Sequence, residues 1–258
     1  MNLIDTHSHL YAEEFDEDRK LAIEKCLEKG VNKICLPNVD SQSIERMLKL
    51  ESEFPEACFA MMGLHPCSVN QDFETELSIV KSWLDKRNFI AVGEIGIDLY
   101  WDKTFVEEQK HCFETQIKWA LHYNLPIVIH CRDAFDEIVE VLNNFAKLPN
   151  GIFHCFSGNI NQAKQIIEFG TFKLGIGGVL TFKNSGLDEV IKNTDLKHLV
   201  LETDSPYLAP VPFRGKRNES SYLPLIAEKL ASVKNTTLDE IAKTTTENAL
   251  QVFNLPGK

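Results

Sequence analysis

Side chains that can bind metal ions or transfer protons occur in short motifs spread along the chain. Five are histidines and two are acids. They are, in chain order, His7 and His9 in DTHSHL, His65 in GLHP, Glu94 in GEIGID, His130 in IHCRDA, His154 in FHCFSG and Asp204 in LETDSP. A single buried histidine is usually a packed core residue. If all seven groups meet, they are desolvated together without enough hydrogen-bond donors, and a bound cation removes that problem.

The spacing of His7 and His9 suits a shared ion, because residues i and i+2 of a strand point to the same face. Imidazole and carboxylate donors together suit Zn²⁺, Mn²⁺ or Fe²⁺, and carboxylate-rich sites also accept Mg²⁺. The set is too large for one tetrahedral ion, and Glu94 can bridge two. The sequence therefore predicts a site for two divalent metal ions, roughly 3.5–4 Å apart, with Zn²⁺, Mg²⁺ and Mn²⁺ left open.

The elements that must position these groups alternate from end to end. Short β-type runs are expected at residues 3–6, 33–36, 58–63, 90–94, 127–130, 152–154, 172–175 and 199–202. Helical stretches are expected at residues 16–29, 41–53, 74–86, 105–123, 134–146, 162–169, 221–232 and 238–253. Alternation of this kind indicates a parallel sheet, and eight units in a chain of 258 residues fit a closed (β/α)8 TIM barrel in one domain over residues 1–258. Such a barrel has its active site at the C-terminal strand ends, where the seven side chains fall.

Composition narrows the class of protein. With 43% hydrophobic residues the chain can bury a sizeable core, and no apolar run approaches the roughly 18 residues of a membrane span. We expect neither a signal peptide nor a membrane segment. Seven cysteines without a C-x-x-C pair indicate reduced thiols, so we expect a cytoplasmic protein. The net charge of −11 argues against non-specific nucleic-acid binding, but it permits a local basic site.

Six ordered motifs resemble those of the TatD family of metal-dependent deoxyribonucleases, within the amidohydrolase superfamily. They are DTHSHL, GLHP, GEIGIDLYW, IHCRDA, FHCFSG and LETDSPYLAP with RGKRNE, and they run from Ile4 to about Glu219. The resemblance implies a barrel of the metal-dependent hydrolase type and a 3′–5′ exonuclease acting on single-stranded or damaged DNA. It also implies metal ligands at His7, His9, Glu94, His130, His154 and Asp204.

Two carboxylates are the candidate catalytic residues. Glu94 is expected to bridge the ions. Asp204 is the candidate general base for an attacking water, as the corresponding position is thought to be in amidohydrolase-type sites. The alternative for Asp204 is a metal ligand without a role in proton transfer.

Further residues near the strand ends are candidates for binding substrate. His65 is expected to contact a phosphate, and further phosphate contacts are expected from Arg132, Ser157, Arg214 and Lys216. For Arg214 and Lys216, together with Arg217, the alternative is a solvated turn. Tyr100 and Trp101 could stack a base or anchor their loop.

Other residues are assigned supporting positions. Asp5 and Glu202 alternate with His9 and Asp204, so both can point inward and support the ligands. His111, His122 and His198 are expected to be surface or packing residues, because they lie away from the C-terminal strand ends.

Three classes of function remain open from the sequence. The first is a deoxyribonuclease acting on single-stranded DNA or other nucleic-acid ends. The second is a C–N or ester hydrolase on the same metal scaffold, such as a D-aminoacyl-tRNA deacylase. Many such hydrolases bridge their ions with a carboxylated lysine on strand four, and Glu94 at that position favours the phosphodiesterase. The third is a binding protein that keeps metal for stability. No obligate protein partner is indicated.

Overall fold

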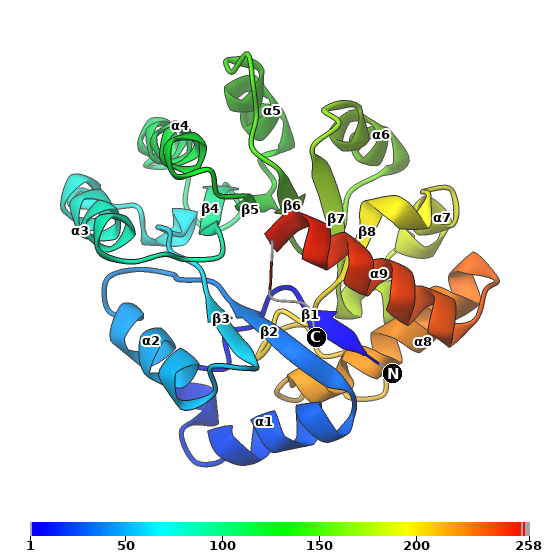
Figure 1. Cartoon of the computed structure of the whole chain (residues 1–258). Helices are drawn as coiled ribbons and strands as arrows, with labels where there is room; N and C mark the ends of the chain where they lie inside the picture. The colour runs from blue at the N-terminus through cyan, green and yellow to red at the C-terminus, as the bar shows by residue number, and fades with distance from the viewer. Residues whose placement is uncertain (1, 254, 256–258) are drawn as a thin grey trace.

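Parallel strands and helices alternate along the chain in a computed structural model that describes residues 2–253 and 255 (Figure 1). The strands are β1 Leu3–Asp5, β2 Val31–Leu36, β3 Cys58–Ala60, β4 Val92–Asp98, β5 Ile127–Arg132, β6 Gly151–Phe153, β7 Phe172–Ile176 and β8 Leu199–Leu201. The α-helices are α1 Arg19–Glu28, α2 Ile44–Glu53, α3 Phe73–Lys86, α4 Val106–Tyr123, α5 Phe135–Asn143, α6 Ile160–Glu168, α7 Leu187–Lys192, α8 Leu223–Lys234 and α9 Leu238–Phe253. None of the described helices is long and apolar enough to span a membrane.

The strands form two parallel sheets, β1-β2-β3 and β4-β5-β6-β7-β8, and backbone hydrogen bonds join their edges. At one seam Met62 N donates to Ala91 O over 3.2 Å. At the other, Thr6 N donates to Leu201 O over 3.0 Å. The strands thus make a ring with the helices outside it (Figure 1), and the predicted (β/α)8 barrel is confirmed.

The element boundaries differ from the predictions mainly at β4. This strand continues to Asp98, whereas the sequence suggested an end at Glu94. Gly96 allows the continuation, because it has φ +144° and a Cβ there would lie 2.0 Å from the backbone oxygen of His130. Glu94 and Asp98 therefore share one strand and one face of it. The short helix α7 was not among the predicted elements.

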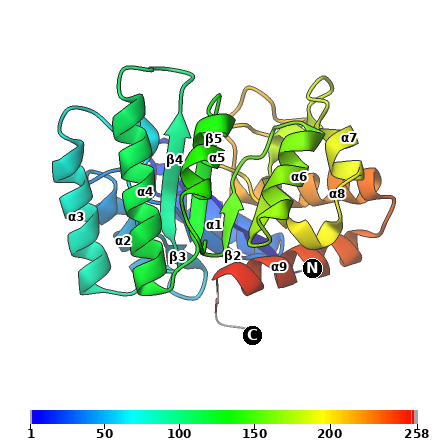
Figure 2. The same cartoon turned by 90° about the horizontal axis from the view of Figure 1, so that it is seen from above.

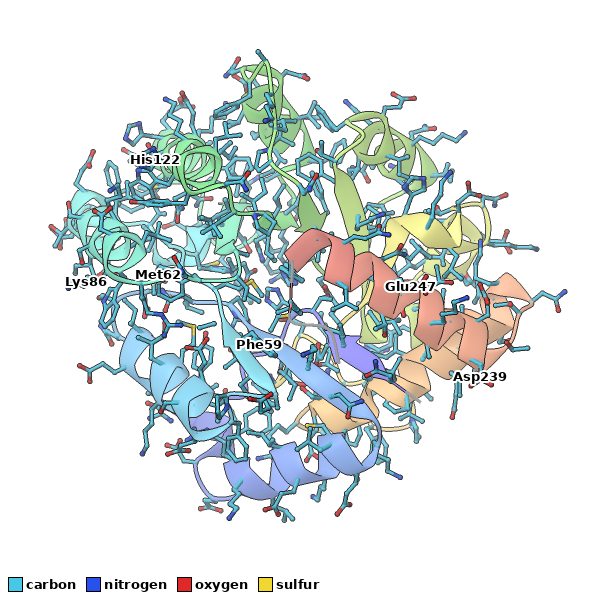
Figure 3. The ribbon with its side chains drawn as sticks, viewed as in Figure 1. Phe59, Met62, Lys86, His122, Asp239 and Glu247 are labelled. Carbon is cyan, nitrogen blue, oxygen red and sulfur yellow. The ribbon has the colours of Figure 1, made fainter. Side chains whose placement is uncertain are left out.

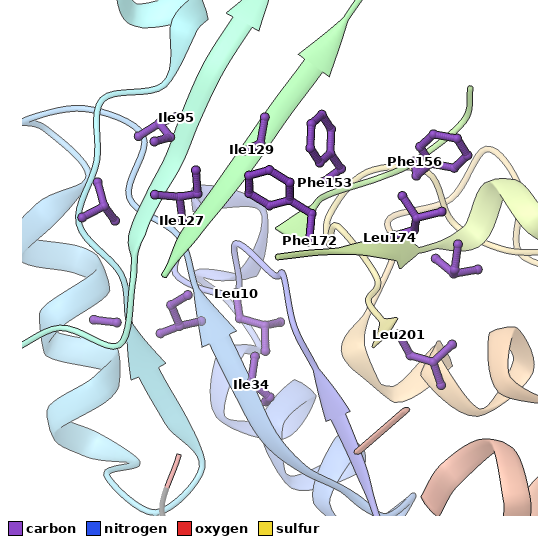
Figure 4. Close-up of a cluster of buried hydrophobic side chains, with 14 of the residues drawn as sticks. Leu10, Ile34, Ile95, Ile127, Ile129, Phe153, Phe156, Phe172, Leu174 and Leu201 are labelled. Atoms are coloured by element: carbon purple, nitrogen blue, oxygen red, sulfur yellow. The ribbon is translucent and has the colours of Figure 1, made fainter. Parts of the chain in front are cut away.

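The barrel interior is apolar at the end where the strands begin. One residue from each of seven chain segments packs there against α9, which lies across this end (Figure 2). These residues are Ile4, Cys35, Met61, Ala91, Val128, Ile152 and Val200. A second apolar cluster, which includes Ile95, Ile129 and Phe153, fills the space between strands and helices (Figure 4). Since this end is filled, polar groups inside the barrel are placed at the other end.

Two buried glutamines on α4 hold the backbone near that other end. Gln116 is fully buried, and its Oε1 accepts from Leu64 N over 2.7 Å while its Nε2 donates to Leu64 O over 3.2 Å. Gln109, two turns earlier on the same face, accepts from Asp98 N over 2.9 Å. The helix thereby fixes the backbone beside His65 and at Asp98.

We predict that Gln116→Leu lowers the free energy of unfolding by about 1–3 kcal/mol, because Leu64 would keep a buried N–H and C=O without partners. Urea unfolding followed by circular dichroism measures the change. Gln251→Leu, at an exposed position of α9, is the control and should shift stability by less than about 0.5 kcal/mol. Equal stability of the two variants would show that the hydrogen bonds between Gln116 and Leu64 contribute nothing to the free energy of unfolding.

Candidate functional site

The seven side chains singled out in the sequence gather at the C-terminal end of the barrel. His7 and His9 follow β1, His65 follows β3, and His154 and Asp204 follow β6 and β8. Glu94 and His130 lie within β4 and β5. Parallel strands end at the same rim, and this is why residues up to 197 positions apart in the sequence meet here.

Glu94 is the centre of the cluster and is only 2% exposed. Its Oε1 lies 2.7 Å from His130 Nδ1, 2.9 Å from His154 Nε2 and 3.2 Å from His65 Nε2. Its Oε2 lies 3.0 Å from His7 Nε2. One buried carboxylate therefore faces imidazole nitrogens on both of its oxygens.

His7, His9 and Asp204 form a second group that overlaps the first. The Nε2 atoms of His7 and His9 are 3.3 Å apart, and each lies 3.7 Å from Asp204 Oδ1. Two imidazole lone pairs that approach this closely repel each other unless a proton or a cation lies between them. The geometry therefore suits a cation held by both rings and the carboxylate.

The imidazoles of the cluster differ in protonation, and His7 and His9 are the ones that agree with a donor set for a cation. At His154 burial would lower the pKa, but the charge of Glu94 outweighs it and raises the pKa well above its ordinary value. Burial, reinforced by the nearby His154, lowers the pKa of His7 to about 4. Burial also holds the pKa of His9 well below its ordinary value. For Glu94, burial alone would raise the pKa, but the surrounding imidazoles hold it well below its usual range. At neutral pH this part of the site thus offers a carboxylate and neutral rings with free lone pairs.

The hydrogen bonds of Tyr11 select the tautomer of His9. Its hydroxyl donates to Pro37 O over 2.5 Å and lies 2.9 Å from His9 Nδ1. Because the hydroxyl proton is already used, Nδ1 must carry the hydrogen that it donates to Tyr11. The lone pair of His9 is then on Nε2, which faces the site. Tyr11 was not among the predicted site residues, because this contact depends on the folded backbone near Pro37.

Asp98 has a comparable role for His130. Its Oδ2 lies 2.8 Å from His130 Nε2, on the opposite side of the ring from Glu94. Burial opposes ionisation of both groups, but these hydrogen bonds outweigh it, raising the pKa of His130 and lowering that of Asp98 to about 2. Asp98 was not in the predicted ligand set. Its position four residues after Glu94, on the same face of a strand, was the available signal.

His65 faces Glu94 and is 13% exposed. Its Nδ1 accepts from Cys67 N over 3.0 Å, so in the neutral ring the proton is on Nε2, which points at Glu94. His65 is thus placed to donate a hydrogen bond within the cluster. Its contact with a substrate phosphate remains a prediction.

The two carboxylates expected to support the site do so in different ways. Glu202 Oε1 accepts from Cys155 N and lies 3.4 Å from His154 Nδ1. Asp5 contacts neither of the neighbouring imidazoles. It accepts from His7 N over 3.3 Å and from Thr203 N and Oγ1 over 2.9 and 2.6 Å, and so ties the segment after β1 to the segment after β8.

Arg132, at the end of β5, and Ser157, Arg214 and Lys216, on loops at the mouth, are all exposed. The guanidinium carbon of Arg132 lies 3.7 Å from the centroid of the Tyr100 ring, and that of Arg214 lies 3.9 Å from the centroid of Phe182.

Two of the candidate residues on the mouth loops, Ser157 and Arg217, lie close to acidic side chains. Ser157 lines a cavity of about 460 Å³ together with the acids Asp133, Asp136 and Glu137. Arg217 donates to Asp18 and Glu219, which indicates a structural role. The three histidines assigned to surface or packing positions stay outside the cluster; His122, for example, lies on the outer side of α4 (Figure 3).

The atoms of the cluster that can ligate a metal ion fall into three groups, and within each group the atoms lie within 4.8 Å of one another. The groups are His7, His9 and Asp204; His7, Glu94 and His154; and His65, Glu94 and His130. His7 and Glu94 each belong to two groups. The side chains present therefore fit divalent cations.

Known proteins are similar to this chain over nearly all of its length. The uncharacterized metal-dependent hydrolase YabD of Bacillus subtilis (strain 168) is 39% identical over 255 residues, which cover 98% of this chain and 99% of the relative. The 3′-5′ ssDNA/RNA exonuclease TatD of Pectobacterium carotovorum subsp. carotovorum (strain PC1) is 28% identical, with 98% of this chain and 100% of that protein covered.

The crystal structure of YjjV, a TatD homolog from Escherichia coli K12, matches with a TM-score of 0.92 at 31% identity, covering 98% of each chain. The family described as TatD related DNase matches residues 4–254. The resemblance seen in the six motifs is therefore confirmed, and the chain belongs to the TatD related DNase family.

Proposed function

We propose that the protein is a metal-dependent hydrolase that removes nucleotides from the 3′ ends of single-stranded DNA. The observation that carries the proposal is the buried Glu94 carboxylate, with imidazoles on both of its oxygens and a second carboxylate, Asp204, beside them. The family supports it, as does the name of the Pectobacterium relative, which is an exonuclease of single-stranded DNA and RNA.

Six residues would hold two divalent ions, whose identity among Zn²⁺, Mg²⁺ and Mn²⁺ stays open. They are His7, His9, Glu94, His130, His154 and Asp204. Glu94 would bridge the two ions, because its two oxygens face different imidazoles. Oε2 faces two of them, and Oε1 faces the other three. When bound, the ions would lower the pKa of water and stabilise charge on the phosphoryl and leaving oxygens.

Asp204 is assigned as the general base. Its side chain is 13% exposed, against 2% for Glu94, so it is the carboxylate that an incoming water can reach. Without bound cations, burial raises its pKa to about 7, so of the two carboxylates it binds a proton more readily than Glu94 does. Its backbone has φ +57° and is held by a 2.9 Å hydrogen bond from its N–H to His7 O, so the carboxylate has a defined position.

The substrate backbone would be oriented by donors around the mouth. His65, Arg132, Arg214 and Lys216 supply positive charge or N–H groups, and Ser157 supplies a hydroxyl. These few basic residues lie on a chain of net charge −11. We therefore propose local engagement of a strand end without an extended basic groove.

Product analysis tests the function. A single-stranded DNA labelled at its 3′ end should release labelled nucleoside monophosphate with Mg²⁺, Mn²⁺ or Zn²⁺, and His130→Ala should release none. Aminoacyl-tRNA is the matched alternative substrate. Release of a free amino acid from it, with intact DNA under all three metals, would replace the exonuclease by a deacylase.

We predict that Asp204→Asn retains metal but lowers kcat by about 10²–10⁴-fold, because the amide cannot accept the proton from water. Metal content by mass spectrometry and single-turnover rates measure the two effects separately. If the variant keeps both its metal and the wild-type rate, Asp204 does not act as the base.

We predict that Glu94→Gln removes the stabilisation that metal gives to the folded protein. A ligand that binds only the native state raises the melting temperature, so adding Mn²⁺ or Zn²⁺ to EDTA-treated wild-type protein should raise Tm, with binding of about two ions per chain by calorimetry. Glu107→Gln, at an 84% exposed position, should respond as the wild type does. An equal rise in Tm for Glu94→Gln would remove Glu94 from the ligand set.

A further inference from the structure

Exposed apolar side chains concentrate around the mouth of the site. Among the described residues, seven large apolar side chains are exposed, and two of them, Leu21 and Leu27, lie on α1. The other five belong to the loops after β4 and β8. They are Tyr100, Trp101, Tyr207, Leu208 and Val211. Exposed apolar surface gathered beside a polar site is typical of an interaction site.

The loop after β4 is tied directly to the site. Asp98 Oδ2 lies 2.8 Å from His130 Nε2, while Oδ1 of the same carboxylate accepts from Tyr100 N over 3.0 Å. Tyr100 and Trp101 are 52% and 73% exposed, and their rings are perpendicular with centroids 4.7 Å apart. The exposed indole of Trp101 therefore lies on a loop whose first residues are hydrogen-bonded, through Asp98, to His130.

Arg132 adds a cation to this aromatic pair. It lies two residues after His130 on β5 and so points to the same face of the strand. Its guanidinium carbon is 3.7 Å from the centroid of Tyr100 and 5.3 Å from that of Trp101. Aromatic faces bind flat π-systems and guanidinium groups bind phosphate, so the two together match a nucleotide.

The loop after β8 presents a second aromatic ring. Tyr207 is 54% exposed, and its ring centroid lies 6.1 Å from that of His9 at an angle of 66°. Its backbone N–H donates to Asp204 O over 2.8 Å, which places it next to the proposed base. β4 and β8 stand four strands apart in a ring of eight (Figure 1), so the two aromatic groups flank the cluster from opposite sides.

We propose that Tyr100 with Trp101, and Tyr207 on the other side, are stacking subsites for the unpaired bases next to the scissile phosphate. This inference rests on the proposed function, because it assumes a nucleic-acid strand in the site. Stacking on aromatic rings is tolerant of sequence, since every base has a π-face. It requires unpaired bases, because the bases of a duplex already stack on one another. The loops would thus set the preference for single strands.

Tryptophan fluorescence tests the proposal on the metal-loaded protein. The probe is a cleavage-resistant phosphorothioate oligothymidylate of about eight nucleotides. It should quench the emission of the wild-type protein, and Trp101→Phe should abolish the quenching. Trp83→Phe, at a partly buried position of α3, is the matched control and should keep it. Quenching that persists in Trp101→Phe would overturn the subsite after β4.

The affinity of the loop variants for the DNA strand distinguishes a loss of stacking from a general disturbance of the loop. By fluorescence anisotropy, Trp101→Ala and Tyr207→Ala should each weaken binding of the strand about tenfold, whereas Trp101→Phe and Tyr207→Phe should stay within about threefold. A strand with abasic sugars at its two 3′-terminal positions should bind the wild type about as weakly as the intact strand binds the alanine variants. Equal affinity for abasic and intact strands would overturn the proposal.

The outcomes distinguish this inference from the proposed function. Quenching and base-dependent binding without nucleotide release under any divalent metal would retain the stacking subsites and reject the exonuclease. Nucleotide release with an unchanged KM in both alanine variants would retain the exonuclease and reject the subsites.

Discussion

The arrangement of the site follows from one constraint, the compensation of a buried negative charge at Glu94. A carboxylate that is 2% exposed is costly unless groups of opposite polarity surround it. Here the compensation comes from five imidazoles on four different chain segments, and no single helix or strand could supply them all. The barrel can, because parallel strands bring their C-terminal ends to one rim. His130 and His154, whose pKa values are raised, supply positive charge at one oxygen of Glu94. His7 and His9 are neutral and would instead bind a cation through their lone pairs.

Successive residues on one face of a strand, two positions apart, contribute to different layers of the barrel, so the residues of the apolar core are distinct from those of the site. On β5, Val128 belongs to the apolar layer beneath the site, His130 to the cluster, and Arg132 to the mouth. One strand face thus supplies the core, the candidate ligand and the candidate substrate contact in order. Since α9 packs against the apolar layer, the polar layer can be crowded and poorly compensated without exposing the core.

The sequence predicted the strand order and the residues of the cluster, because both depend on local patterns. Histidines after short apolar runs mark strand ends whatever the details of packing. The residues that it missed act through tertiary contacts. Tyr11 selects the tautomer of His9 only because Pro37 O lies within 2.5 Å, and Gln116 supports the backbone beside His65 from a helix 52 residues later. The sequence pattern predicted a fourth strand that ends at Glu94, whereas the strand continues through Gly96, where the close approach of His130 O leaves room only for glycine.

The pKa values of the two carboxylates of the cluster, Glu94 and Asp204, are shifted in opposite directions. This difference supports separate roles for them. The imidazoles that surround Glu94 hold its pKa well below its usual range, so it stays charged and is suited to hold cations. At Asp204, burial raises the pKa to about 7, with the charge of Glu94 contributing in the same direction. A pair of titratable groups with opposite shifts is typical of sites where one group provides fixed charge and the other transfers protons. The more exposed of the two, Asp204, is also the one with Tyr207 beside it, so the proposed base and a proposed stacking ring meet the substrate from one loop.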